Sequence, residues 1–597
     1  MLKHLTRFDI FALLLFGVLW TYLTGRVFLV EPIHDELATL FHYIDYNTIV
    51  GRNMITDTIL DANNHLLNSF LGKICYSLFG DHIWAIRLPN LLSFILFFYA
   101  IYKIALLLRN DLLKYTFVVG STCIPYVLDY FAYCRGYGMS MAFLMMGVYW
   151  FIQLAKNYSH RYMIFMAILL ILGIYANLNL VITAMMMFTF IGIKLLISAF
   201  QDKNFKSFVV FCMISLVTAG LLLFAVYFSF LLKISGALYY GNKDGLWLTT
   251  GATLSESILF SKSLIIKYTL IVLIVLIVAH TIYFWVSKKS LAFFQNPATL
   301  FTGLLLGNLI AIELMRWLMD VNYPEDRVGM HLIFFFVGTL IFILDEYALL
   351  TSLSLVFLIF PIVGWKHFNF VSSIFSPNDR IEKQDFDAYL QQIKPDKSAN
   401  IYHTQRLAYA YHVRENNPTN FIVPGIFNRN LNYDEEIVSS LSDSVIKEKS
   451  KGYKLIRQNN RTWFELLQRK KQYTWKTVAE NATQQTLSLS DKFYNIIDSA
   501  WVNYKDKRVK YVLEYTVNTP DLRRETLILV VDKTTKNAES NYESFKLNWA
   551  AGKHKTYTFH KVIEFNPSEI EDLRVYLYNP NELNYTILKR VVVLKIN

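Results

Sequence analysis

The feature that most constrains the fold of this chain is a series of long apolar runs within roughly its first 365 residues. Each run approaches the ~20 residues that a helix needs to cross the hydrocarbon core of a bilayer. With 54% apolar and only 17% charged residues, the composition also argues against a soluble protein. We predict about eleven transmembrane helices, near residues 8–30, 83–108, 113–131, 138–155, 161–178, 180–200, 207–232, 263–287, 297–318, 328–345 and 347–365. No small-residue cleavage site follows the first run, so we expect it to be a helix rather than a signal peptide.

The basic residues of the short loops predict the orientation of these helices. The positive-inside rule places such loops in the cytoplasm, at Lys3/Arg7, Arg109/Lys114, Lys156/Arg161, Lys203/Lys206 and Lys288/Lys289. The loop that begins at Glu31 then faces outward. The turn between the last two predicted helices carries Asp345 and Glu346 and no basic residue. We expect two crossings there because the apolar stretch is long enough, whereas a single crossing would leave the C-terminal region cytoplasmic.

Charge and cysteine content argue against two further classes of protein, nucleic-acid-binding and disulfide-rich proteins. The net charge is +12, but lysine and arginine are spread through loops and the C-terminal region, so we expect no nucleic-acid partner. The four cysteines all lie in the apolar part of the chain, which does not suggest a disulfide framework.

The composition changes after Pro361, where the long apolar runs stop. We predict a linker and a small α/β region over 366–470, with helical spacing of apolar residues in 381–394 and a short strand in 420–425. Over 471–597 apolar and polar residues alternate in short segments, which predicts an antiparallel β-sandwich. We expect most of its aromatic residues to form the core, although exposed Trp and Tyr rings could bind sugars.

Charged residues next to the predicted outer helix ends are the main candidates for function. A charge at a helix centre costs about 2.5–3.5 kcal/mol on insertion scales, so retained charges usually face a cavity. Acidic and basic residues both occur at the predicted outer helix ends, namely Asp35, Glu36, Asp61, His65, Arg87, Asp129, Arg135, Glu313, Arg316, Asp320, Glu325, Asp326 and Arg327. A carboxylate can deprotonate an acceptor while guanidinium groups hold a phosphate leaving group. The set suits transfer from a phosphate-linked donor, although each charge alone is equally explained as a loop residue or headgroup anchor.

Five short motifs stand in the same order as in a known family. They are the pair Asp35-Glu36, LDANNHLLN with Asp61, Asn64 and His65, LFGDHIWAIRLPN with Arg87, CRGY with Arg135, and NYPEDR with Tyr323 and Arg327. Through them residues 8–365 resemble the GT-C fold glycosyltransferases that use polyprenyl-phosphate sugars. The nearest resemblance is to the branch of protein O-mannosyltransferases and lipid A aminoarabinose transferases.

The resemblance implies a GT-C transmembrane domain over 1–365, with an outer catalytic loop over 31–82. Asp35 would be the general base on the acceptor, and Glu36 would position it. The resemblance further implies that Asp61, Asn64 and His65 orient the acceptor, and that the donor phosphate is bound by Arg87, Arg135, Tyr323 and Arg327. The sugar would pass from an isoprenoid phosphate to the acceptor by direct displacement, with inversion at the anomeric carbon.

The chain departs from the family pattern beside His65. Leu66-Leu67 stand where many relatives have consecutive prolines, and Asn64 stands where some have an acidic residue. No cofactor is certain: Asp35 and Asp61 could hold a divalent cation, but hard cations normally take more oxygen ligands or retain waters. The sequence therefore leaves metal dependence open. It contains no glycine-rich phosphate loop of the P-loop type, which argues against a nucleotide-sugar donor.

The expected partners are a polyprenyl-phosphate sugar, membrane lipids, and an acceptor that is lipid A, a protein or a cell-surface glycan. Abundant Asn, Lys, Ile and Tyr indicate an AT-rich genome, which favours a bacterial source. We therefore expect an inner-membrane protein whose catalytic loop and C-terminal domain are periplasmic. The alternative function is a transporter or flippase of lipid-linked sugars, but such proteins often carry internal repeats, and none is detected here. A sugar-binding scaffold would need only one or two spans. A lipid-linked oligosaccharide ligase or polymerase would be expected to place its large outer loop later in the chain.

Overall fold

The chain divides into two units. The computed structural model describes residues 5–45, 64–236, 240–261, 263–288, 291–374, 381–427, 434–441, 450–481, 486–489, 491–497, 508–519, 527–536, 540–580, 582 and 584–596. A helical unit comprises residues 1–30 and 48–375, and a β-rich unit comprises residues 31–47 and 376–597. The predicted outer loop over 31–82 is thus divided between the two units, since its first part clusters with the β-rich unit.

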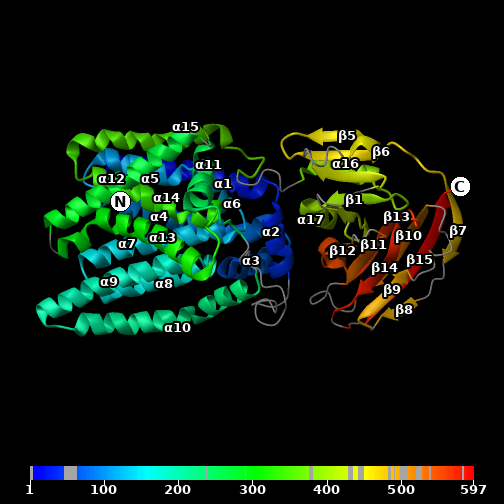
Figure 1. Ribbon diagram of the computed structural model, residues 1–597, viewed down its shortest axis with the longest axis horizontal. Coiled ribbons are helices and arrows are strands. Elements are labelled where there is room, and N and C mark those ends of the chain that lie inside the picture. The colour runs from blue at the N-terminus through cyan, green and yellow to red at the C-terminus, as the bar shows by residue number, and fades with distance from the viewer. Residues whose placement is uncertain are drawn as a thin grey trace. The chain divides into compact units, whose positions relative to one another are not determined.

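The helical unit is a bundle of helices joined by short loops (Figure 1). Its α-helices are α1 (Arg7–Leu29), α3 (Leu66–Phe79), α4 (Ile83–Ala105), α5 (Asp111–Thr122), α6 (Pro125–Ala132), α7 (Gly136–Lys156), α8 (His160–Ala176), α9 (Leu180–Asp202), α10 (Lys206–Ile234), α11 (Ala252–Leu259), α12 (Leu264–Lys288), α13 (Pro297–Met319), α14 (His331–Leu344) and α15 (Ile359–Gly364). Short π- or 3₁₀-helices are η4 (Trp247–Gly251), η5 (Leu291–Gln295), η6 (Asp326–Gly329), η7 (Ala348–Leu358) and η8 (Trp365–His367).

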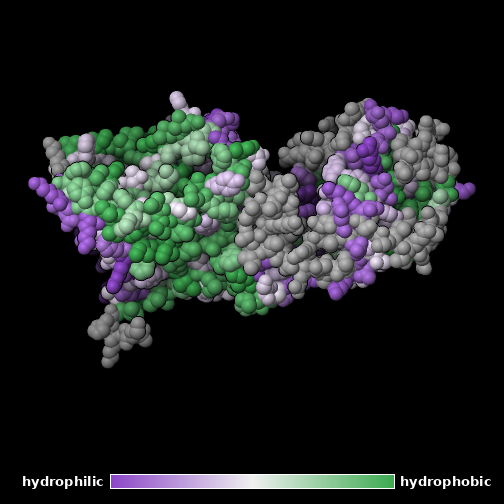
Figure 2. Space-filling model, turned by 90° about the horizontal axis from the view of Figure 1, so that it is seen from below, coloured by the Kyte–Doolittle hydropathy of each residue, from purple (hydrophilic) through white to green (hydrophobic). Residues whose placement is uncertain are grey.

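The helical unit has the length and surface of a membrane domain. Among the described residues, eight helices are long and apolar enough to cross a bilayer: α1, α4, α7, α9, α10, α12, α13 and the helical stretch Ala348–His367. Figure 2 shows that hydrophobic side chains dominate the visible face of this unit, with hydrophilic ones in patches toward its ends. The chain is therefore an integral membrane protein, and the predicted class, a polytopic helical region before a β-rich one, is confirmed. The count of eleven spans stays a prediction.

One predicted helix is wrong. The segment 113–131 was expected to form a single span, but it folds as α5 and α6, with a break at Cys123. Pro125 is the first residue of α6, and Ile124 before it is extended, with φ −95° and ψ 108°. Proline has no N–H for an i→i−4 bond and disfavours helical geometry in the preceding residue, so the helix has to restart there.

The acidic turn before the last helical stretch lies next to a basic loop. Asp345 accepts hydrogen bonds from the backbone N–H groups of Arg109 and Asn110, both at 3.1 Å, and from Arg109 Nε at 3.3 Å. Glu346 accepts from the side chain of Asn296, just before α13. The turn thus lies at the same end of the bundle as the α4–α5 connection. Arg109 supplies the positive charge that the turn itself lacks, which favours two crossings over one.

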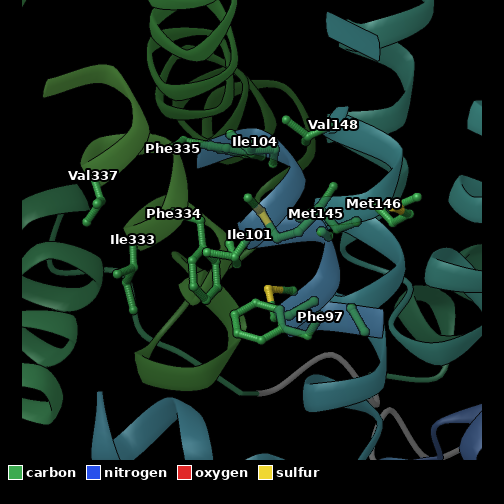
Figure 3. Close-up of a cluster of buried hydrophobic side chains, with 14 of the residues drawn as sticks. Phe97, Ile101, Ile104, Met145, Met146, Val148, Ile333, Phe334, Phe335 and Val337 are labelled. Carbon is green, nitrogen blue, oxygen red and sulfur yellow. The ribbon is translucent and has the colours of Figure 1, made fainter. Parts of the chain in front are cut away.

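The core of the helical unit lies where α4, α7 and α14 pack together. Figure 3 shows Phe97 and Ile101 of α4 beside Phe334 of α14, and the ring centroids of Phe97 and Phe334 are 5.3 Å apart. Met145 of α7 joins the same buried cluster. Because lipid tails are as apolar as these side chains, such helices associate mainly through close van der Waals packing.

The β-rich unit begins with a small α/β part. Its helices are α16 (Lys383–Gln392) and α17 (Arg406–Asn416), and its strands are β1 (Ala399–Tyr402), β3 (Gly425–Phe427), β4 (Ile437–Leu441), β5 (Tyr453–Asn459) and β6 (Phe464–Arg469). The strands form one sheet in the order β3-β1-β4-β6-β5, with β1 parallel to both neighbours. The helix predicted within 381–394 and the strand predicted within 420–425 are confirmed.

The remaining strands form two further sheets. They are β2 (Asn420–Ile422), β7 (Trp475–Asn481), β8 (Thr486–Leu489), β9 (Phe493–Ile497), β10 (Val509–Asn518), β11 (Ile528–Thr535), β12 (Ser540–Lys546), β13 (Thr556–Phe565), β14 (Ile570–Tyr578) and β15 (Tyr585–Ile596), and α19 (Leu547–Ala551) follows β12. One sheet has the order β2-β13-β10-β15-β7, with β8 also on β15, and the other β12-β11-β14-β9. All pairs are antiparallel except β2 with β13. From Tyr511 onward, buried and half-buried positions alternate along β10, as the period-two pattern predicts.

An ionic cluster joins the α/β part to β13. Glu564 accepts hydrogen bonds from Arg469 Nη1, Arg508 Nε and Ser398 Oγ, each at 2.7 Å, and its side chain is only 1% exposed. Burial alone would raise the pKa of Glu564, but the hydrogen bond and charge of Arg469 and the charge of Arg508 outweigh burial and lower the pKa. The cluster therefore depends on an ionised carboxylate.

We expect Glu564→Gln to lower the free energy of unfolding by about 3–5 kcal/mol, because two buried guanidinium groups lose their carboxylate. Thermal unfolding followed by intrinsic fluorescence measures this. Arg574→Gln is the control, since Arg574 is 69% exposed and should matter little. Because folding lowers this pKa, the contribution is present above the unfolded value of about 4.3 and is lost as the pH falls through the folded value. The variant should lose less stability on acidification, and an unchanged midpoint would contradict the assignment.

Candidate functional site

The predicted outer charges of the helical unit gather at one end of its bundle. Arg87 near the start of α4 donates to the carbonyl oxygens of Val27 and Val30 at the end of α1, at 2.9 and 2.8 Å. His65, just before α3, lies 2.9 Å from the carbonyl oxygen of Ala176 at the end of α8. The starts of α3 and α4 therefore meet the ends of α8 and α1 at this end of the bundle. The Asp345 turn lies at the other end, beside the end of α4.

Arg327 lies close enough to Tyr130, Tyr137 and Tyr240 to interact with each of them electrostatically. It lies in η6, its side chain is 15% exposed, and its guanidinium carbon is 4.5 Å from the centre of the Tyr240 ring. Its Nη1 is 3.6 Å from a carboxylate oxygen of Asp326. A guanidinium over an aromatic face contributes about 0.5–2 kcal/mol, more where it is desolvated. The Tyr240 ring and the Asp326 carboxylate thus both hold the guanidinium close to the surface.

The turn that carries Arg327 has a strained backbone, which hydrogen bonds from η4 and α11 hold in place. Asp326 has φ +38°, a left-handed conformation that non-glycine residues seldom adopt. Its backbone N–H donates to Thr253 Oγ1 at 2.9 Å, and Thr250 Oγ1 donates to the carbonyl oxygen of Pro324 at 2.6 Å. Residues of η4 and α11 thus fix the backbone of the turn that carries Arg327.

Four tyrosines lie close enough to Arg327 to interact with it electrostatically, namely Tyr126, Tyr130, Tyr137 and Tyr240. Tyr240 donates from its hydroxyl to Asp326 Oδ2 at 2.7 Å. Tyr130 and Tyr126 of α6 contact each other, with hydroxyls 3.4 Å apart, and Tyr130 packs edge-on against Tyr137 of α7, with centroids 5.2 Å apart. Burial raises the pKa of Tyr240, as does Asp326, although Arg327 opposes them. Its hydroxyl therefore stays protonated and able to donate a hydrogen bond.

His65 adjoins one of these tyrosines, and Asn64 precedes His65 in the chain. The His65 ring packs against Tyr137, with centroids 4.6 Å apart, and Asn64 Oδ1 accepts from Ser69 Oγ at 2.9 Å. The close approach depends on Gly136, because a Cβ there would collide with the carbonyl oxygen of Ala176 and lie 2.6 Å from His65 Cβ. The glycine of the CRGY motif is thus needed for contact between α3, α7 and α8.

Helix starts add to the positive charge of this end. α3, α7 and α14 begin after His65, after Arg135 and at His331, and none has an acidic residue in its first turn. Helix N-termini carry partial positive charge and point N–H groups at anions. Arg135 is fully buried, with its guanidinium carbon 5.8 Å from the centre of the Tyr137 ring. Tyr137 therefore lies next to both Arg135 and the surroundings of Arg327.

Other charges at this end support the fold. Arg26 and Asp129 form a fully buried ion pair, and Arg26 also donates to the carbonyl oxygens of Asn369 and Ser372. Arg87, also fully buried, has its guanidinium carbon 4.9 Å from the centre of the Tyr133 ring. Arg87 thus holds the start of α4 against the end of α1, and its assignment as a phosphate ligand stays a prediction.

Tyr323 and Glu313 lie beside an apolar groove. The Tyr323 hydroxyl donates to Glu313 Oε2 at 2.9 Å, and the Tyr323 N–H donates to the carbonyl oxygen of Asn242, also at 2.9 Å. Glu313 lines a groove of about 400 Å³ along one face of α13, together with Leu246, Leu309, Ile310, Leu314, Trp317 and Leu318. The predicted phosphate ligand Tyr323 thus connects the turn of Arg327 to this groove.

The predicted acidic residues belong to the other unit or lie outside the described residues. Asp35 and Glu36 are on α2 (His34–Thr39), which clusters with the β-rich unit, and Glu36 is fully buried. The adjoining η2 (Leu40–Ile44) is followed by Asp45, whose Oδ2 lies 2.9 Å from Nη1 of Arg414 in α17. Asp61 lies outside the described residues. Among the described residues no group of three or more His, Cys, Asp or Glu could hold a metal ion, and the predicted cation on Asp35 and Asp61 stays a prediction.

The sequence motifs include some of the residues around Arg327, whereas other residues there belong to no motif. Arg327, Arg135 and His65 were predicted, and Asp326 was among the outer charges. Tyr126 and Tyr130 could have been noticed as two hydroxyl groups one helical turn apart in an apolar segment. Tyr240 carries no motif and reaches the site only through the fold.

Comparisons with known proteins add little at the level of sequence. No protein-family model and no curated protein matches the chain. Among solved structures, ArnT from Cupriavidus metallidurans in the apo state aligns over 77% of this chain and 97% of its own, at 9% identity and a TM-score of 0.36. Arabinosyltransferase EmbB from Mycobacterium smegmatis aligns over 100% and 64%, at 9% identity and a TM-score of 0.35. The Archaeoglobus fulgidus oligosaccharyltransferase in complex with Zn and sulfate aligns over 95% and 94%, at 10% identity and a TM-score of 0.36. Likenesses this distant decide neither the fold nor the activity of this chain.

Gly136→Ala tests whether contact between α3, α7 and α8 builds the site. We expect it to lower the free energy of unfolding by about 1–3 kcal/mol, because the added methyl group has to displace Ala176 or His65. The apparent unfolding midpoint in detergent measures this. Gly220→Ala on α10 is the matched control, since a Cβ there meets nothing within 4 Å. Equal midpoints for the two variants would contradict the close packing.

Proposed function

We propose that this chain is an integral-membrane glycosyltransferase that takes a sugar from a polyprenyl-phosphate donor. The observation that carries the proposal is the guanidinium of Arg327, which lies over the Tyr240 ring and interacts electrostatically with Tyr130 and Tyr137. Ionisable residues kept in a membrane domain usually mark a functional site or a substrate path. The motif resemblance to GT-C enzymes supports the same assignment.

The chemistry of this site suits a phosphate. Guanidinium N–H groups and protonated tyrosine hydroxyls both donate hydrogen bonds to phosphate oxygens, and charge-assisted bonds are about twice as strong as neutral ones. The starts of α3, α7 and α14 add partial positive charge. The proposed phosphate ligands are Arg87, Arg135, Tyr323 and Arg327. Asn64 and His65 are the proposed orienting residues for the acceptor.

The apolar chain of the donor needs a place beside the phosphate. The groove along α13 is lined almost wholly by apolar side chains and adjoins Tyr323 through Glu313. We assign the isoprenoid chain to this groove. A lipid-soluble donor could then enter sideways from the bilayer and present its phosphate to the turn that carries Arg327.

The proposed reaction is a single displacement. The acceptor oxygen or nitrogen forms a bond to the anomeric carbon while the bond from that carbon to the phosphate oxygen breaks. The isoprenoid phosphate leaves with the electron pair, and the acceptor proton passes to a carboxylate. Asp35 is the proposed base and Glu36 its positioning partner, with Asp61 as a further candidate; no step depends on a metal. Attack opposite the leaving group inverts the anomeric centre.

The proposed location follows from charge. The Arg109 loop and the Asp345 turn share one end of the bundle, which the positive-inside rule places in the cytoplasm. The Arg327 end would then face the periplasm of a bacterial inner membrane. The acceptor is proposed to be lipid A, a protein or a cell-surface glycan at that face.

Replacement of Arg327 tests the donor site. We expect Arg327→Gln to raise the KM for a polyprenyl-phosphate sugar about 10- to 150-fold, because hydrogen bonds to a charged group contribute about 1.5–3 kcal/mol. The measurement is transfer of labelled sugar by the purified protein in detergent over a range of donor concentrations. Arg109→Gln, at the other end of the bundle and 72% exposed, is the control and should keep the wild-type KM. A wild-type KM for Arg327→Gln would remove this residue from the donor site.

Replacement of Asp35 tests the base. Asp35→Asn should lower turnover about 10²- to 10⁴-fold while donor binding stays nearly intact, because a general base acts only in the chemical step. Asp111→Asn, 77% exposed at the start of α5, is the control. If Asp35→Asn is as active as wild type, Glu36 or Asp61 takes over the role. If wild type binds donors and never transfers or hydrolyses them, the lipid-linked sugar transporter becomes the better function.

A further inference from the structure

A group of basic and aromatic side chains lies in the β-rich unit, where α2 and α19 pack against α17. The guanidinium carbon of Arg406 is 5.9 Å from the centre of the Trp549 ring, and the ring centroids of Trp549 and His42 are 5.4 Å apart. His34 donates from Nδ1 to the carbonyl oxygen of Thr404 at 2.8 Å, two residues before Arg406. We call the following residues the α17 cluster: His34, His42, His403, Arg406 and Trp549.

Arg406 carries the charge of this cluster. It is the first residue of α17, it is half-buried, and it has no carboxylate partner among the described residues. Burial lowers the pKa of Arg406, and no carboxylate opposes that effect. Asp35 and Glu36 lie on the same helix as His34, but neither pairs with Arg406. The first turn of α17 also contains no acidic residue and no side-chain cap, so the charge of Arg406 is not compensated there.

The basic groups of the α17 cluster are close enough to act on one another. Burial, followed by the charges of Lys546, Arg406 and His34, lowers the pKa of His42 to about 3. Burial and the charges of Arg406 and His34 also lower the pKa of His403. No carboxylate opposes these effects on either histidine. The electrostatic potential at the cluster is therefore positive.

Three ring nitrogens of the cluster are buried and have no hydrogen-bond partner among the described residues. They are Trp549 Nε1, His42 Nδ1 and His403 Nδ1, and Trp549 is only 4% exposed. Buried polar groups without a partner are costly and rare in folded proteins. A water molecule can accept a hydrogen bond from one of these nitrogens, but it brings no negative charge to Arg406. The cluster thus combines free donors with a free charge.

These free groups favour an oxyanion with several oxygens. A guanidinium, an indole N–H and an imidazole with its proton on Nδ1 all donate hydrogen bonds from the atoms concerned. A neutral sugar would leave the charge of Arg406 unopposed. A carboxylate offers two oxygens in one plane, whereas a phosphate group offers more oxygens in different directions. Because the donors come from three separate segments of the chain, a phosphate suits them better.

We propose that the α17 cluster of the β-rich unit is a binding site for a phosphate group. Arg406 binds two of the phosphate oxygens with its guanidinium fork, and Trp549, His42 and His403 donate to the others. The phosphate belongs to a lipid headgroup or to a soluble molecule. The inference goes beyond the proposed transfer reaction and does not depend on it, because phosphate binding is measured without any sugar donor.

The test uses the full-length protein in detergent and a phosphate-free buffer, with inorganic phosphate and dihexanoyl phosphatidylglycerol as probes in isothermal titration calorimetry. We expect at least one probe to bind wild type, and we expect Arg406→Gln to weaken its Kd about 10- to 150-fold. Trp549→Phe keeps a packed ring and loses only the N–H, so it should weaken Kd about 2- to 10-fold. Arg461→Gln is the matched control, because Arg461 is a 57% exposed arginine of the same unit that already pairs with Glu382, and its Kd should equal that of wild type.

Two further measurements keep the test decisive. Arg406→Gln should weaken phosphate binding by the same factor in a chain that also carries Arg327→Gln, which separates this site from the proposed donor site. The apparent unfolding midpoint shows whether each variant is folded, and Trp549→Phe decides the outcome if Arg406→Gln is not. Binding of inorganic phosphate identifies a soluble ligand, and binding of phosphatidylglycerol alone identifies a lipid headgroup. Failure of both probes to bind wild type, or wild-type Kd in folded Arg406→Gln, would overturn the proposal.

Discussion

The helical unit depends on one buried ion pair, that of Arg26 with Asp129. Two unpaired charges could not remain in a membrane protein core, because even a paired charge there costs several kcal/mol of desolvation. The additional hydrogen bonds offset this cost: Arg26 donates to Asn369 and Ser372, and Asp129 accepts from Ser373 Oγ at 3.2 Å and Ile374 N at 2.7 Å. The pair thereby ties α1, α6 and the chain after η8 together at one end of the bundle.

The position of α6 decides where the candidate site lies. Asp129 sits on the same short helix as Tyr126 and Tyr130, so the ion pair also fixes the two tyrosines that face Tyr137 and the surroundings of Arg327. The break at Pro125 gives this short helix its own direction, separate from α5. Charges at this end therefore fall into two groups. Arg26, Asp129 and Arg87 maintain the packing, and Arg327 with Asp326 remains at the partly exposed surface, where a ligand can reach it.

The sequence predicts the fold well where the signal is local. Length and hydropathy of an apolar run are properties of consecutive residues, so α1, α4, α7, α9, α10, α12 and α13 were predicted close to their observed places. Alternation along β10 is equally local. The α5–α6 break was missed because Pro125 was averaged into an apolar run. The role of Asp345 was also hidden, since its compensating Arg109 lies far away in the chain.

By itself, the sequence determined the membrane-embedded class, the change to a β-rich region after Pro361, and the set of polar residues at one end of the helices. Only the tertiary structure decided which groups each of those residues contacts. Arg87 and Arg327 have the same charge and similar positions beside a helix, yet one donates to the end of α1 and the other lies over Tyr240. The reason is physical: a side chain's role depends on which distant groups satisfy its hydrogen bonds, and those partners are set by packing between helices rather than by neighbours in the chain.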